Sequence, residues 1–516
     1  MNNRRVSRDS LDWAISHVAR HGDTDIFPVP FEYGALSEEW PEILQRLTSR
    51  RFDTMPARAP LILPVPKAQG GFRIAHQLDP IDTLVYTALV YEMGQHIERY
   101  RQGGTACAYR FDSTTAGDFY PQDNGWGTFT ERSRYLAGRS SFVLHLDLAD
   151  FYNQIYHHRL AGALESAGIS KERAVNVEKF LGRFTAWQSQ GIPVGPSASH
   201  LLAECCLVDI DSSLRTMRVG FVRYIDDFRI FAKTKRTLNR VQQDLCELLY
   251  TNHRLAVQGS KTYIESTDRF LRHRLNDPKA MVEDEVEARL DELAAQINEE
   301  TGYEVTIEDV DEDTLEEEVG ECLEELLGEC LSATPVHFGT IRFVLRMANR
   351  MQSGAITGTI LDNLATLAPI MGEIARYLSK EIEAMTAKEA KNVGDLLLRV
   401  GTKSAYAGSS FVALCIVDLL TRFPRLASFG RALAFVDSNA ALGVRSKALL
   451  ARAHDEVYWV RSQKEGFMDL GPWDRRALIW SAGVLPGSER DVWLGKIQGQ
   501  LEDPLEVALA RRVAGL

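Results

Sequence analysis

The stretch that decides the fold is Gly220-Phe-Val-Arg-Tyr-Ile-Asp-Asp-Phe-Arg-Ile-Phe-Ala232. Two adjacent carboxylates, Asp226 and Asp227, stand between short runs rich in Val, Ile, Phe and Tyr, which predicts a β-hairpin with the acids at its turn. Adjacent aspartates repel each other and are costly to bury unless a hard divalent cation lies beside them, so the pair favours Mg²⁺. A solvated Asp-Asp turn is the competing interpretation when such a dipeptide stands alone.

A second acidic position precedes the hairpin, at the end of the apolar run Ser141-Phe-Val-Leu-His-Leu-Asp147. If that run is a buried strand beside the hairpin, Asp147 completes a cluster of three carboxylates. Such a cluster can hold two metal ions about 3.5 to 4 Å apart, which activate a hydroxyl and stabilise the leaving group in an in-line phosphoryl transfer. We therefore expect two-metal chemistry at this hairpin.

A glycine-rich loop, Gln190-Gly-Ile-Pro-Val-Gly-Pro-Ser-Ala-Ser199, lies between these two stretches. Gly191 and Gly195 permit close backbone approach, and Ser197 or Ser199 is expected to begin a helix. We expect nucleic-acid backbone or an incoming nucleotide to lie against this loop.

In this order and spacing, the three stretches resemble the palm of reverse transcriptases: a first-aspartate motif, a Gly-x-Pro-x-Gly loop, and Tyr-x-Asp-Asp at Tyr224 to Asp227. The resemblance implies an α+β fold with fingers and palm, and DNA synthesis from dNTPs with two Mg²⁺ ions, for which Mn²⁺ can substitute. It implies metal ligation by Asp147, Leu148, Asp226 and Asp227, and nucleotide binding by Gln190, Gly191 and Pro193.

Two further residues take roles from the resemblance. Tyr152 matches the bulky side chain that clashes with a ribose 2′-hydroxyl, which predicts use of dNTPs over NTPs; a packed aromatic is the alternative. Lys261 matches a lysine near the pyrophosphate leaving group, a general acid; an ordinary exposed lysine is the alternative.

The segment Pro64-Val-Pro-Lys-Ala-Gln-Gly-Gly-Phe-Arg73 predicts a hairpin in a fingers region. Lys67 and Arg73 flank its Gly-Gly turn, where two cations can clamp a triphosphate; a solvated hairpin tip is the alternative. The buried helix expected from Thr83 onward has Asp82 as its predicted cap.

The composition is that of a globular protein with more than one domain: 516 residues, 45% hydrophobic and 25% charged. Neither an apolar signal segment nor an apolar run of membrane length is found, so a cytoplasmic protein without membrane contact is expected. The seven cysteines are scattered and show no C-x-x-C spacing, so neither a disulfide framework nor a zinc site is implied, and buried, reduced thiols are favoured. His157 and His158 are expected on the surface.

The net charge of −12 is unevenly distributed. Residues 283–329 contain 21 Asp and Glu and a single base, Arg289, so this block carries −20 and the rest of the chain +8. A basic body with one acidic block is compatible with phosphate binding outside the block. The block itself is interpreted as two charged helices around an acidic loop, forming a solvated face or insertion.

The expected organisation comprises an N-terminal helical segment (1–50), fingers (51–140), palm (141–280), an acidic helical insertion (281–332) and an all-α C-terminal domain (333–516). In the last, apolar residues recur at helical spacing. A weak echo between Lys447-Ala-Leu-Leu and Arg476-Ala-Leu-Ile predicts stacked helical hairpins of HEAT type.

The full pattern is similar to the abortive-infection and defence-associated reverse transcriptases of bacteria. The similarity includes Gly22-Asp-Thr-Asp-Ile-Phe-Pro28, whose Asp23 and Asp25 are interpreted as capping and turn residues, and Trp473-Asp-Arg-Arg-Ala-Leu-Ile479. It implies DNA synthesis in response to phage infection, often in a homo-oligomer. The synthesis copies an associated noncoding RNA, proceeds without template, or starts from a protein hydroxyl.

Two other functions stay open. One is a template-copying enzyme of retron or intron type; the other is a non-catalytic polymerase-shaped toxin or scaffold. Intact Asp147, Asp226 and Asp227 disfavour the scaffold.

Overall fold

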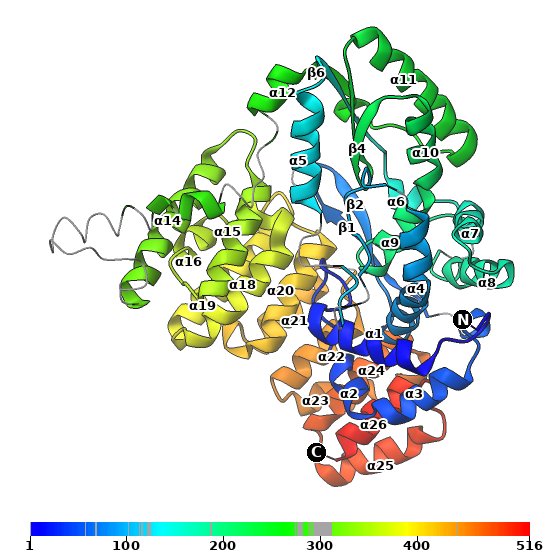
Figure 1. Ribbon diagram of the computed structural model, residues 1–516. Helices are drawn as coiled ribbons and strands as arrows, with labels where there is room; N and C mark the ends of the chain where they lie inside the picture. Colours follow the sequence, from blue (N-terminus) through cyan, green and yellow to red (C-terminus); the bar gives the residue numbers. More distant parts are fainter. Residues whose placement is uncertain are drawn as a thin grey trace. The chain divides into compact units, whose positions relative to one another are not determined.

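The computed structural model describes residues 2–515 except 57, 68–69, 102, 113, 115–116, 121–124, 186–187, 274, 276–281, 287, 290–291, 293–311 and 440. The chain divides into two compact units, whose helices and strands are labelled in Figure 1. One consists of Met1–Ile62 and Ile74–Leu275, and the other of Leu63–Arg73 and Asn276–Leu516. The bounds of the five segments predicted from the sequence stay predictions.

The first unit is built on a four-stranded antiparallel sheet with strand order β4-β5-β3-β6. Its strands are β3 (Phe142–Asp147), β4 (Gly220–Tyr224), β5 (Asp227–Ala232) and β6 (Tyr263–Ser266). The predicted hairpin is therefore confirmed as β4-β5, and the apolar run ending at Asp147 is the strand beside it. Side chains alternate between the two faces because the strand period is two residues.

Helices cover both faces of this sheet. Val143 and Phe231 form a core cluster with Ala137 of α5 (Trp126–Ala137) and Phe270 of α12 (Thr267–His273). On the alternate face Leu146, Phe228 and Ile230 are fully buried, and α11 (Lys235–Leu248) packs on β3 and β5. The centre of the sheet is therefore buried between helices.

Helices also precede and connect the strands of this unit. A separate two-stranded sheet consists of β1 (Leu61–Pro66) and β2 (Phe72–Gln77), and residues 63–73 of this hairpin are assigned to the second unit. The other elements are α1 (Arg8–His21), α2 (Glu32–Glu38), α3 (Trp40–Ser49), η1 (Phe52–Thr54), α4 (Pro80–Tyr100), α6 (Phe151–Gln154), α7 (His157–Ser166), α8 (Lys171–Gly182), α9 (Ala198–Cys206), α10 (Val208–Thr216), η2 (Leu249–His253) and η3 (Gly259–Lys261).

The predicted cap of the long buried helix α4 is wrong by one turn. Asp79 is the N-cap residue, and its carboxylate accepts a hydrogen bond from the Ile81 amide at 3.0 Å. Pro80 occupies the first helical position, where proline's missing N–H is no loss. Asp82 is buried inside the first turn, where it pairs with Arg58 at 3.4 Å.

The second unit is helical after residue 311. Its elements are α14 (Glu312–Ser332), α15 (Phe338–Met351), α16 (Thr357–Asp362), α17 (Leu364–Leu367), η5 (Ala368–Ile370), α18 (Met371–Ala384), α19 (Ala387–Lys403), α20 (Ser410–Arg422), η6 (Pro424–Leu426), α21 (Phe429–Asp437), α22 (Val444–Ala453), α23 (Val457–Gln463), η7 (Phe467–Asp469), α24 (Pro472–Ser481), η8 (Ala482–Val484), α25 (Gly487–Gln498) and α26 (Pro504–Ala514).

The C-terminal helices are stacked, as the sequence predicts. Helices α15, α18, α20, α22, α24 and α26 each pack on the next in this series. The echoed segments fall on α22 and α24, two helices that pack directly on each other. Of the acidic block, α14 is the second expected helix, whereas Leu290, Leu293 and Ile297 lie outside the described residues.

All seven cysteines are free thiols, and all but Cys246 are buried, as predicted. Within the described residues, no helix combines the length and apolarity needed to cross a membrane.

Candidate functional site

The turn between β4 and β5 presents the paired aspartates. Tyr224 pairs with Asp227 across the hairpin, so Ile225 and Asp226 form a two-residue turn. Ile225 has φ 53°, in the left-handed region that such tight hairpin turns use. A β-branched residue is strained there, so other contacts must stabilise this conformation.

Asp147 reaches the same end of the sheet from the neighbouring strand. Its Cα lies opposite that of Asp227 in the β3-β5 register. The next residue, Leu148, is buried and donates its amide to the Asp226 carbonyl at 3.2 Å. The three aspartates, distant in sequence, are therefore brought to one end of adjacent strands.

The electrostatics of this strand end indicate crowded negative charge. Burial raises the pKa of Asp226 to about 7, with Asp147 and Asp227 adding to the shift and Lys261 opposing it. Burial also raises the pKa of Asp227, although Arg229 on the same strand opposes this. A cation beside these carboxylates would relieve the cost of ionising them.

Lys261 lies directly at Asp147. Its Nζ is 3.2 Å from both carboxylate oxygens of Asp147, and the side chain remains 57% exposed. The segment before Lys261 is anchored to β3, because the Gln258 amide donates to the Asp147 carbonyl at 2.7 Å. The lysine predicted to act at the leaving group is thus placed at the acidic end of the sheet.

The donor set of this strand end consists of carboxylate oxygens, the ligands that Mg²⁺ prefers. No group of three His, Cys, Asp or Glu side chains over the described part of the chain has the geometry of a metal site. Asp147 is instead paired with Lys261. The chemistry of the donors fits divalent ions, while ligation by Asp147, Leu148, Asp226 and Asp227 stays a prediction.

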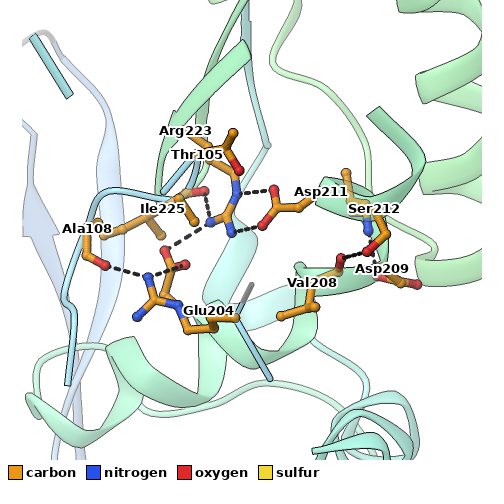
Figure 2. A network of polar contacts seen from close by, with 12 residues as sticks. Thr105, Ala108, Glu204, Val208, Asp209, Asp211, Ser212, Arg223 and Ile225 are labelled. Carbon is orange, nitrogen blue, oxygen red and sulfur yellow. Dashed lines mark hydrogen bonds and ion pairs between the residues drawn. The ribbon is translucent and has the colours of Figure 1, made fainter. Parts of the chain in front are cut away.

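A buried ionic network holds the turn in place (Figure 2). Arg223 donates to both carboxylate oxygens of Asp211 at 2.9 and 2.7 Å, and to Glu204 at 2.9 Å. Its Nη1 also donates to the carbonyl of Ile225 at 2.9 Å. Burial opposes the charge of Arg223, but Asp211 and Glu204 outweigh it and raise the pKa of the guanidinium.

The network extends from the hairpin to α4. Arg101 bonds the second oxygen of Glu204 at 2.9 Å and the Ala108 carbonyl at 2.6 Å. Arg223 and Glu204 are fully buried, so each charge depends on its partners. Sequence reasoning missed this network; its signal was an arginine inside the apolar strand before the aspartates.

The glycine-rich loop has the backbone that its glycines predict. Gly191 and Gly195 have φ of 92° and 132°. A Cβ at Gly195 would lie 3.1 Å from the His76 carbonyl and 3.2 Å from the Thr24 methyl group. Ser197 precedes α9, as expected.

The three predicted nucleotide-binding positions of this loop differ in exposure. Gln190 is half-buried, whereas Gly191 and Pro193 are buried. His157, expected on the surface, is buried instead, and its Nε2 lies 2.6 Å from the Gly191 carbonyl. His158 is exposed, as predicted. Nucleotide binding by the loop stays a prediction.

The N-terminal segment around Asp23 contacts this loop, which sequence reasoning also missed. Asp23, predicted as a capping or turn residue, lies in a bend and is 4% exposed; its carboxylate accepts a hydrogen bond from Gln77 at 3.0 Å. Burial raises its pKa to about 7. In the same segment the Thr24 hydroxyl accepts a hydrogen bond from the Phe27 amide at 3.0 Å.

Tyr152 stands in an aromatic group near the aspartates. Its hydroxyl lies 2.6 Å from Nδ1 of His200, and the ring of Tyr109 stacks on His200 at 3.9 Å. Burial lowers the pKa of His200 to about 4, so the imidazole is neutral and can accept the tyrosine hydroxyl. The hydrogen bond fixes the ring of Tyr152, while its role in sugar discrimination stays a prediction.

Lys67 and Arg73 are both exposed and flank the hairpin turn as predicted. Gly70 and Gly71 have positive φ, and the Lys67 amide donates to the Gly71 carbonyl at 2.9 Å. Ala68 and Gln69, between them, lie outside the described residues. The triphosphate clamp stays a prediction.

Comparison with known proteins identifies the domain. Residues 65–287 match the family model described as reverse transcriptase (RNA-dependent DNA polymerase). A search of curated proteins gave no match.

Similar solved structures include telomerase from Candida albicans in complex with the TWJ fragment of telomeric RNA: 12% identity, TM-score 0.32, and coverage of 75% of this chain and 65% of that one. Apo telomerase from Candida tropicalis is 12% identical with a TM-score of 0.30, over 74% of this chain and 68% of that one. This chain thus spans about 65% of the length of the first. Residues 65–287, which include the Tyr-Ile-Asp-Asp turn, form a reverse transcriptase domain, the domain of RNA-directed DNA polymerases.

Proposed function

We propose that the protein is a DNA polymerase that transfers the nucleotidyl group of a dNTP to a 3′-hydroxyl or a protein hydroxyl. The observation that supports it is the register of β3 and β5, which brings Asp147 opposite Asp227 and next to the Asp226 turn. Two bound Mg²⁺ ions would activate the hydroxyl and stabilise the charge of the transferring phosphoryl group. The acceptor oxygen bonds to the α-phosphorus as pyrophosphate leaves.

Different residues of the chain serve different parts of the proposed reaction. Asp147, Asp226 and Asp227 supply the negative charge that concentrates cations at the strand end. Lys261, exposed and cationic beside Asp147, provides a proton for the departing pyrophosphate. Tyr152 restricts the space at the sugar, and Arg223 positions the turn through the Ile225 carbonyl.

Replacement of one acid tests the proposal. Asp226→Asn keeps the size of the side chain and removes its charge, so dNTP incorporation should fall by several powers of ten while folding is kept. Asp9→Asn, an exposed carboxylate on α1, is the matched control and should leave incorporation unchanged. A near-normal rate for Asp226→Asn would refute the two-metal mechanism.

We further infer that this synthesis serves antiviral defence in the cytoplasm, as a homo-oligomer assembled through the C-terminal helices. The support is the similarity of the Gly22–Pro28 and Trp473–Ile479 segments to defence-associated reverse transcriptases. Cells that express the protein should resist phage, and cells that express Asp226→Asn should not. Equal resistance would favour the non-catalytic scaffold.

The nucleic acid that copurifies with the protein separates the remaining alternatives. RNA of defined sequence would indicate a template, of a defence enzyme or of a retron or intron type. DNA covalently attached to the protein would indicate a hydroxyl side chain as primer. Light scattering of the purified protein measures the number of subunits, and a monomer would contradict the oligomer.

A further inference from the structure

The end of the palm sheet opposite the aspartates gathers three segments that are distant in sequence. Phe142, the first residue of β3, pairs with Ala232 at the end of β5 and with Ser266 at the end of β6. The Ser141 amide donates to the Ala232 carbonyl at 3.2 Å, and the Thr267 amide donates to the Ser141 carbonyl at 3.0 Å. Segments 134–141, 232–236 and 266–272 therefore meet at this end of the sheet, and we name their exposed side chains the sheet-end surface.

This surface is strongly basic in a chain whose net charge is −12. Its three segments contain seven cationic side chains and one acidic side chain, Asp268. The seven, all exposed, are Arg134, Arg139, Lys233, Lys235, Arg236, Arg269 and Arg272. Soluble proteins normally intersperse charges of both signs, so a concentration of one sign indicates an anionic partner.

Ion pairs within the described part of the chain neutralise few of these cations. Across the described part of the chain, Arg269 is the one member of the seven that makes an ion pair, with Glu265 at 3.6 Å. Glu265 is itself buried and shared with His145 at 3.0 Å. The like charges of the other six repel one another across the three segments, a cost that a polyanion would remove.

Aromatic rings orient part of this charge. The guanidinium carbon of Arg139 lies 3.7 Å from the ring centroid of Tyr135, which is 59% exposed. The Nζ of Lys235 lies 5.4 Å from the ring of Phe142. Each cation–π contact holds a flexible side chain in place, which reduces the conformational entropy that the side chain loses when an anion binds. Tyr135 also offers a surface on which a base can stack.

We propose that the sheet-end surface binds the sugar-phosphate backbone of nucleic acid, at a site separate from the catalytic strand end. The five residue steps from Phe142 to Asp147 span about 17 Å along β3, so one molecule of template or product can contact both ends. The inference rests on the proposed function in that nucleic acid is the substrate, but binding is measurable without synthesis.

The test compares two double variants. Lys233→Gln/Lys235→Gln removes two charges from the sheet-end surface, and Lys171→Gln/Lys179→Gln removes two exposed charges from α8. Fluorescence anisotropy with a labelled, mixed-sequence RNA–DNA duplex, without dNTP, gives Kd over a series of salt concentrations. For two lost phosphate contacts we expect Kd about tenfold higher at low salt and a log–log salt slope shallower by about 1.5 to 2. The α8 variant should match the unmodified protein.

If the two double variants bind the duplex with the same Kd and the same salt slope, the proposal is wrong, whether or not both bind more weakly than the unmodified protein. Poly-glutamate in place of the duplex distinguishes a protein partner: if it binds as tightly and shows the same loss, the surface recognises acidic protein and the proposal fails. Arg139→Gln/Arg272→Gln, drawn from the other two segments, is the second variant if the first changes the melting temperature.

Discussion

At the residue scale, the turn formed by Ile225 and Asp226 combines a strained backbone conformation with a hydrogen bond from a buried arginine. Ile225 adopts a left-handed conformation that β-branched residues disfavour, and Arg223 bonds its carbonyl. The same guanidinium neutralises Glu204 and Asp211. Arg223 is therefore a positioning residue, which acts on Asp226 through the backbone.

We predict that Arg223→Lys lowers kcat for dNTP incorporation about tenfold or more, with a smaller change in KM. Lysine keeps the charge but cannot reach two carboxylates and the Ile225 carbonyl in the same fork geometry. Steady-state kinetics test this, with Arg240→Lys, an exposed residue of α11, as the control. A rise in KM with kcat unchanged would show that Arg223 does not position Asp226 for the reaction.

A second residue-scale prediction concerns the sugar. Tyr152→Ala should admit ribonucleotides, because the ring that restricts the space is removed. Tyr152→Phe removes only the hydroxyl bonded to His200 and should keep most of the discrimination. The ratio of kcat/KM for dNTP to that for NTP measures both. If this ratio is the same in Tyr152→Ala as in the unmodified protein, Tyr152 serves packing.

At the scale of elements, local pattern and long-range packing contributed differently to what the sequence predicts. The hairpin, the strand of Asp147 and the helical C-terminal region follow from alternation and helical spacing, which are local signals. The burial of His157 and Asp23 depends on segments far away in sequence, the Gly191 carbonyl and the Gln77 amide. The Asp79 cap was missed because Asp82 also precedes the apolar run.

The N-terminal segment supplies a pH-dependent prediction for stability. The pKa of Asp23 is raised from 3.8 to about 7 in the folded protein, so its ionised form disfavours folding. The protonated carboxyl of Asp23 is favoured in the folded protein, so the stability that it contributes is fully present below pH 4 and is lost as the pH rises to about 7.

Asp23→Asn should therefore raise the free energy of unfolding, and its advantage should be about 3 kcal/mol larger at pH 8 than at pH 5. Urea denaturation at the two pH values measures this. An advantage of Asp23→Asn that is equal at both pH values would contradict the assignment.

At the scale of the whole molecule, charge is sorted along the chain rather than mixed. Residues 283–329 carry −20, whereas the three segments of the sheet-end surface hold seven exposed basic side chains and one acidic side chain. Composition reveals the acidic block directly, because it is contiguous in sequence. The sheet-end surface could not be predicted from composition, because its three segments are distant in sequence and meet only through strand pairing.

The distribution of thiols has a practical consequence. Six of the seven cysteines are buried, and Cys246 on α11 is the partly accessible one. A maleimide dye should therefore attach to the native protein at this one position, and mass spectrometry of the labelled peptides would show whether it does. Labelling at a second cysteine without denaturant would contradict this. A fluorophore at Cys246 would make the molecule a single-site reporter, without any engineered removal of its other thiols.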